Sequence, residues 1–168
     1  TITQQLVRNT ILQEEQFDST IERKVREAYI AIKMEEMYSK DEILMMYLNS
    51  IYYGAGCYGI EAAAQTYFGK PCSQLTIAEA ATLAGLPQSP SYYNPLANPE
   101  SAIERRNVVL AHLLDKGHIT QQEYDDAVAS DLVLNYTPPE KSGAYAYPYF
   151  VDYVKSTLST QFSTDVIF

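Results

Sequence analysis

Three charged side chains near the start of the chain are spaced so that they could bind a phosphate group. Arg23 and Lys24 stand four and three residues before Glu27, and in a helix these separations place side chains on one face. Arg26, which is adjacent to Glu27, would point elsewhere. Two cations beside one carboxylate make a plausible phosphate site. A solvated helix face with surface ion pairs is the alternative, and for an isolated triplet of this kind it is the more common case.

The segment that carries these residues, 19–36, is predicted to form a helix. Ser19 is placed to cap it, and Glu22, three residues later, completes a capping box. Apolar residues also recur through the segment at helical spacing: Ile21, Val25, Ala28 and Ile32. Such a helix would hold the charged triplet in one arrangement.

A second polar group lies on the helix predicted for residues 1 to 12. Gln5, Arg8 and Asn9 stand at positions i, i+3 and i+4, so their side chains share one face. Apolar residues occupy another face of the same helix. The polar face could form hydrogen bonds to a ligand, but amphipathic helices often carry such triads and the pattern alone is weak evidence.

Capping signals mark further helices along the chain. Three capping boxes precede apolar segments: Ser39 with Glu42, Thr76 with Glu79, and Thr120 with Glu123. Helices are also predicted for 60–68, which Gly69 would end, for 99–116 and for 147–161. Only 132–134 resembles a strand, and it is short. The sequence therefore predicts an all-α fold.

Two of the loops between these helices have a distinctive composition. Three glycines within 52–59 predict a tight turn, but no Lys-Ser/Thr pair follows and no strand precedes them, so neither phosphate-loop motif applies. Residues 88–99 are rich in Pro and Asn and predict an ordered loop, after which Asn98 caps the next helix. In that helix, Arg105 and Arg106 are interpreted as structural residues that hold helix ends or loop carbonyls.

The composition limits the classes of function. The chain has 168 residues and a net charge of -9, and this acidity argues against a general nucleic-acid binder, because phosphate backbones are bound by many Lys and Arg side chains together. No apolar run approaches the roughly 18 residues of a membrane-spanning helix. We expect a piece of a longer protein, with one domain over 1–136 and a link over 137–168 toward another domain.

Four motifs occur in order and carry a family resemblance. They are TITQQLVRN from Thr1, RKVREA from Arg23, SKDEILMMYLNSIYYGAGCYGIEAAAQTYFGK from Ser39, and LTIAEAATLAGLPQSPSYYNP from Leu75 followed by NPESAIERRNVVL from Asn98. With this set, the chain resembles the peptidoglycan glycosyltransferase (transglycosylase) domain of class A penicillin-binding proteins, glycosyltransferase family 51. The set is highly specific, whereas no single motif is.

The resemblance implies a lysozyme-like helical fold, truncated at its N-terminus, and the polymerisation of lipid II into β-1,4-linked glycan strands. The acceptor's sugar 4-hydroxyl would attack the anomeric carbon of the donor, and undecaprenyl pyrophosphate would leave. Cationic side chains suit the charge that develops on that leaving group. The matching positions imply these substrate-binding residues: Gln5, Arg8 (where the family usually has Lys), Asn9, Arg23, Lys24 and Tyr52.

Glu27 matches the second of the family's two essential glutamates, which is implied to assist the leaving group directly or through a divalent cation such as Mg²⁺ or Mn²⁺. Its cationic neighbours favour the ionised carboxylate, which suits an electrostatic or cation-binding role better than proton donation. No cofactor is required otherwise, and no metal ligand is assigned. The first glutamate belongs to an EDxxFxxHxG motif that this sequence lacks. We therefore expect residues 1–168 alone to be nearly inactive, because a general base contributes about 10²- to 10⁴-fold in rate.

The resemblance also implies where the domain works. Its ligands would be lipid II and the nascent glycan strand, and its location the outer face of the bacterial cytoplasmic membrane, reached through an N-terminal anchor. A transpeptidase domain would follow in the same chain. In that oxidising compartment Cys57 and Cys72 are candidates for a disulfide, with two free thiols as the alternative.

Two other classes of function stay open. A lysozyme-like glycan hydrolase would also be helical with a catalytic glutamate, but it has no need of a pyrophosphate site. A non-catalytic helical interaction domain would tolerate replacement of the basic cluster.

Overall fold

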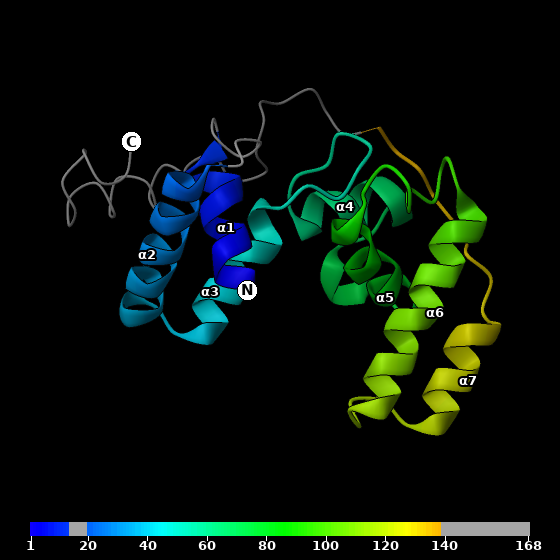
Figure 1. The fold of residues 1–168 in the computed structure, drawn as a ribbon. Coiled ribbons are helices and arrows are strands. Elements are labelled where there is room, and N and C mark those ends of the chain that lie inside the picture. The colour runs from blue at the N-terminus through cyan, green and yellow to red at the C-terminus, as the bar shows by residue number, and fades with distance from the viewer. Residues whose placement is uncertain (14–19, 139–168) are drawn as a thin grey trace. The chain divides into compact units, whose positions relative to one another are not determined.

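The computed structural model describes residues 1–13 and 20–138, and all regular secondary structure within these ranges is helical (Figure 1). The α-helices are α1 (Ile2–Thr10), α2 (Ile21–Met37), α3 (Lys40–Ser50), α4 (Ile60–Phe68), α5 (Ile77–Gly85), α6 (Pro99–Asp115) and α7 (Gln121–Ala129). Two short 3-10 helices, η2 (Cys72–Gln74) and η3 (Leu86–Gln88), flank α5. The prediction of an all-α fold is confirmed for the described residues.

The chain divides into two compact units, one formed by Thr1–Ile51 and the other beginning at Tyr52. The boundary predicted near residue 137 stays a prediction, and the helix predicted for 147–161 lies outside the described residues. Within the described ranges, no helix has the length and apolar character needed to cross a membrane.

Helices α1, α2 and α3 form the first unit around one hydrophobic core. Each of the three packs against the other two. The core is made of buried apolar side chains from all three helices and from the turn after α1: Leu6, Val7, Ile11, Leu12, Ile30, Ala31, Met34, Ile43 and Met46. This core fixes the positions of the polar residues on α1 and α2.

The sequence correctly predicts α2, but the structure differs from the prediction in where the helix begins and in which face is buried. Thr20, not Ser19, is the N-cap: its side chain accepts a hydrogen bond from the backbone N–H of Arg23 at 3.2 Å. Both residue types can cap a helix, and the helix begins one residue later than predicted. The cap that forms is a single hydrogen bond to Thr20 in place of the capping box predicted for Ser19 and Glu22.

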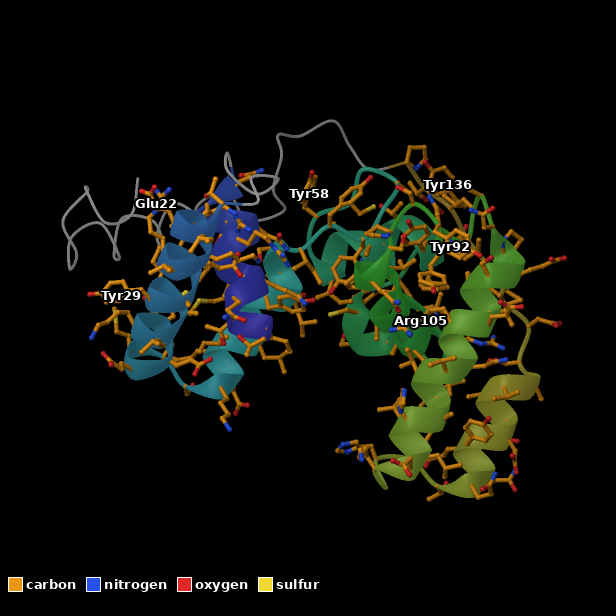
Figure 2. The ribbon with its side chains drawn as sticks, in the orientation of Figure 1. Glu22, Tyr29, Tyr58, Tyr92, Arg105 and Tyr136 are labelled. Atoms are coloured by element: carbon orange, nitrogen blue, oxygen red, sulfur yellow. The ribbon has the colours of Figure 1, made fainter. Side chains whose placement is uncertain are left out.

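The apolar residues that predict α2 lie on its exposed side. Ile21 is 83% exposed, and Val25, Tyr29 and Ile32 are exposed as well. Figure 2 shows Tyr29 directed away from α1. The buried face instead carries residues spaced i, i+4, i+7, i+8 and i+11: Arg23, Glu27, Ile30, Ala31 and Met34. Packing against α1 and α3 therefore brings two charged side chains inward.

Local signals place most other helix ends correctly. The three predicted capping boxes form at the starts of α3, α5 and α7, and Gly69 ends α4 with a φ of 66°. Asn98 does occupy the N-cap of α6, but its side chain does not cap it. The Asn98 amide instead donates to the carbonyl of Tyr92, which ties the loop to the start of the helix.

The glycine-containing segment 52–59 is a tight turn, as predicted. Tyr53 N–H donates to the Cys57 carbonyl at 2.9 Å. Gly54 has a φ of 85°, and a Cβ there would lie 2.9 Å from both the Pro90 carbonyl oxygen and the Tyr67 hydroxyl. Only glycine fits this close approach without displacing its neighbours.

Arg106 holds the last helix of the second unit. Its guanidinium is buried and donates to the carbonyls of Ser130 at 2.9 Å and Val128 at 3.1 Å, at the end of α7. This confirms the structural interpretation of Arg106. Arg105 takes a different role: it lies over the ring of Tyr93, with its guanidinium carbon 5.8 Å from the ring centre, in the region labelled in Figure 2.

The chain after α7 returns to α4. Asn135 and Thr137 donate their backbone N–H groups to the carbonyls of Tyr67 and Thr66, each at 2.9 Å. The short strand considered for 132–134 does not form, and the segment runs outside regular structure to residue 138.

Candidate active site in the first helical unit

The charged triplet of α2 is built around a buried ion pair. Arg23 Nη1 lies 2.6 Å from Glu27 Oε2, and the two residues are only 3% and 4% exposed. The other carboxylate oxygen, Oε1, lies 3.6 Å from Lys24 Nζ. The i, i+4 and i, i+3 geometry is as predicted, but the alternative of a fully solvated surface cluster is wrong for Arg23 and Glu27.

Burial changes what this cluster can do chemically. A charge removed from water is tolerated only when it is paired and hydrogen-bonded. Glu27 faces a cation at each of its oxygens, so it acts as an acceptor that holds two cationic side chains. The side chain of Lys24 is 54% exposed. The cluster thus combines a rigid buried pair with a cation that solvent and ligands can reach.

The polar face of α1 lies in the same unit. Gln5 is exposed, and Arg8 and Asn9 are half-buried, while Leu6 and Val7 between them enter the core. Since α1 packs directly against α2, the polar face and the charged triplet share one compact framework. Figure 1 shows the two helices side by side.

Tyr47 of α3 joins this polar face, which the sequence does not predict. Its hydroxyl donates to Gln5 Oε1 at 3.0 Å. Burial raises the pKa of the Tyr47 phenol, and the positive charge of Arg8 offsets part of that rise. Its spacing along α3 predicts a packing residue only, because a bond between distant segments leaves no trace in helical periodicity.

Comparison with known proteins identifies the family. A family model described as Transglycosylase matches residues 1–114, which include every candidate residue named above. The chain belongs to the transglycosylase family. The resemblance drawn from the four motifs is confirmed.

Transglycosylase relatives cover nearly all of this chain. Penicillin-binding protein 1A of Escherichia coli (strain K12) is 46% identical over 162 residues, which are 96% of this chain and 18% of the relative. Penicillin-binding protein 1A of Aquifex aeolicus (strain VF5) is 48% identical over 157 residues, 93% of this chain and 20% of the relative. The chain therefore spans about a fifth of the length of these relatives.

A solved structure supports the fold. The crystal structure of Penicillin-Binding Protein 1A from Haemophilus influenzae matches with a TM-score of 0.57 and 35% identity, over 96% of this chain and 20% of that one. The all-α, lysozyme-like class predicted for this transglycosylase is thus confirmed.

Tyr52 belongs to the second unit of this transglycosylase. Its ring centre lies 4.9 Å from that of Tyr58, and its hydroxyl accepts from the backbone N–H of Gly56 at 3.3 Å. Residues 52 and 58 also form an isolated antiparallel bridge. Its predicted role in donor binding stays a prediction.

The residues around Glu27 do not fit a divalent cation. Hard cations such as Mg²⁺ are bound by several oxygen ligands, yet both Glu27 oxygens face cationic nitrogens. Within the described ranges, no group of three or more His, Cys, Asp and Glu side chains is placed to hold a metal. The charge that a metal would supply is instead present here as Arg23 and Lys24.

The disulfide considered for Cys57 and Cys72 is not formed: both are free thiols in the structure. Each cysteine has separate partners. Cys57 is buried in the glycine turn, where burial raises the pKa of its thiol. Cys72 starts η2, and its backbone N–H donates to Glu61 Oε2 at 2.9 Å. A separate hydrogen bond between the Cys72 thiol and the Glu61 carboxylate raises the pKa of that thiol.

Proposed function

We propose that the protein containing this transglycosylase chain polymerises lipid II into β-1,4-linked glycan strands and releases undecaprenyl pyrophosphate. The observation that carries the proposal is the buried Arg23–Glu27 pair with Lys24 exposed beside it. Membership in the transglycosylase family supplies the reaction class.

Pyrophosphate departure is the step that these residues serve. The acceptor 4-hydroxyl forms a bond to the donor's anomeric carbon as the bond from that carbon to the pyrophosphate oxygen breaks. The bonding electrons leave with the pyrophosphate, and the hydroxyl proton passes to a general base, for which the family pattern provides a glutamate in an EDxxFxxHxG motif. Lys24, Arg23 and Arg8 would stabilise the negative charge on the leaving group, because preorganised cations act most strongly where charge develops.

In this mechanism Glu27 acts through its cations. Each of its oxygens faces one of the two basic side chains, at 2.6 Å for Arg23 and 3.6 Å for Lys24. The carboxylate therefore holds both nitrogens in place before substrate arrives, so that little reorganisation is needed during reaction. No step in this scheme passes through a bound metal.

The names of the relatives indicate where this chain works and which molecules it meets. They are penicillin-binding proteins, so we infer that this chain works in the bacterial cell envelope, on the outer side of the cytoplasmic membrane. A covalently linked transpeptidase domain and the nascent glycan strand would be its partners. Lipid II would be the lipid-linked donor.

Polymerisation of lipid II by the complete protein tests the proposal. Glu27→Gln removes the charge but keeps the shape of the side chain, and we expect a loss of about 10²-fold or more. Glu36→Gln is the matched control, because Glu36 lies on the same helix and pairs with Lys33 at the surface. Full activity of a folded Glu27→Gln variant would contradict the proposal. Cleavage of polymerised glycan, without use of lipid II, would favour a hydrolase instead.

A further inference from the structure

Tyr47 connects α3 to the polar face of α1. Its hydroxyl donates to Gln5 Oε1 at 3.0 Å, and its half-buried ring packs against the core of the first unit. The capping box of Ser39 and Glu42 begins the helix that carries it. The phenol is therefore held from behind by packing, while its hydroxyl reaches an exposed residue.

In the structure this bond engages the oxygen end of the Gln5 amide. A glutamine amide has one acceptor oxygen and an NH₂ group with two donors. Because Tyr47 occupies the oxygen, the Nε2 donors are left to face solvent or a ligand. With Arg8, which carries only donors, Gln5 then presents a surface of N–H groups.

A pyrophosphate is the matching ligand for such a surface. Its oxygens are acceptors, and N–H donors that include a charged group bind them strongly. If the Gln5 amide turned over, its oxygen would face the phosphate oxygens and repel them. Burial raises the pKa of the Tyr47 phenol, and the nearby positive charge of Arg8 offsets only part of that rise. Tyr47 therefore remains a hydrogen-bond donor at neutral pH.

We propose that Tyr47 is a positioning residue that fixes the Gln5 amide with its NH₂ group toward the pyrophosphate of the lipid-linked donor. This inference rests on the proposed function and deepens it. Tyr47 itself need not touch the substrate.

The direct test is Tyr47→Phe in the complete protein, since this change keeps the packed ring and removes only the hydroxyl. We expect KM for lipid II to rise about 3- to 10-fold, the effect of one hydrogen bond, with kcat changed by less than about 2-fold. A merely structural role would reduce the fraction of folded enzyme, which lowers kcat and leaves KM unchanged. That result would overturn the proposal. Tyr29→Phe, on the exposed side of α2, is the matched control and should leave both constants unchanged.

A double-mutant cycle tests whether Tyr47 works through Gln5. If it does, Tyr47→Phe should add nothing to the KM effect of Gln5→Ala, because the partner it orients is already gone. Multiplied effects in the double variant would show independent roles and would overturn the proposal.

Binding of inorganic pyrophosphate separates this inference from the proposed function. Calorimetry on the complete protein should show an affinity about 3- to 10-fold lower for Tyr47→Phe than for wild type. Unchanged affinity would overturn the positioning role even if lipid II is polymerised. Failure of wild type to polymerise lipid II, together with the expected loss of pyrophosphate affinity, would overturn the proposed function and leave the positioning role supported.

Discussion

Each helical unit buries one arginine, and the two are satisfied in opposite ways. Arg23 in the first unit is paired with the buried carboxylate of Glu27. Arg106 in the second unit has no carboxylate partner among the described residues and is bound by the backbone carbonyls of Ser130 and Val128 and by the side chain of Asn107. Burial lowers the pKa of the Arg106 guanidinium.

The difference separates a structural charge from one that can serve a site. Arg106 directs its donors to the carbonyls at the end of α7, so its charged group holds that helix in place. The Arg23–Glu27 pair keeps both a positive and a negative group inside the protein, with Lys24 open to ligands beside them. Replacing such a pair by apolar residues is often neutral for stability, so its presence at a helix face points to function rather than to folding.

The largest expected effect comes from breaking the pair at Arg23. Arg23→Met leaves the buried Glu27 carboxylate without its nearer cation and with only the half-exposed Lys24 beside it, and we expect the free energy of unfolding to fall by about 3–5 kcal/mol. Adding Glu27→Leu should restore most of that stability but none of the lipid II polymerisation. Urea denaturation and a polymerisation assay on both variants check this. Recovery of activity in the double variant would show that the pair contributes only to packing.

A smaller effect is expected from Arg106. Arg106→Leu leaves the carbonyls at the end of α7 without donors, and we expect a loss of about 1–3 kcal/mol in the free energy of unfolding. Activity per folded molecule should not change, because no proposed contact to lipid II involves this residue. An altered KM in the folded variant would contradict the contrast between the two arginines.

The smallest effect on stability is expected at Lys24. Lys24→Gln removes one partner of a half-exposed ion pair, and such pairs contribute about 0.2–1 kcal/mol. Polymerisation should nevertheless fall by about 10-fold or more, since a cation near the leaving group is lost. Lys33→Gln, also on α2 and paired with Glu36 at the surface, should leave activity unchanged. Equal activity of the two variants would place Lys24 outside the site.

Local rules predict much of this molecule. Capping boxes such as that of Ser39 and Glu42 depend on residues three apart, and the spacing of Arg23, Lys24 and Glu27 determines their geometry within one helix. Both predictions agree with the structure, because neither depends on contacts with distant segments. The family motifs then predict which charged face matters.

Tertiary packing decides what those rules leave open. Ile21, Val25 and Ile32 repeat as a buried face would, yet they lie outward because α1 and α3 cover the opposite side of α2. The hydrogen bond from Tyr47 to Gln5 joins two helices, and no periodicity predicts it. Apolar spacing identifies a helix reliably, but it does not say which face meets the rest of the protein.

The return of the chain to α4 also defines a path for mechanical load. Residues 130 and 135–137 are held at two points: the Arg106 guanidinium binds the Ser130 carbonyl, and α4 accepts the N–H groups of Asn135 and Thr137. Tension arriving at residue 138 from the following chain therefore meets the two backbone bonds on α4 first. The bond to Arg106, and with it the seating of α7 on α6, would be strained only after those two bonds had broken.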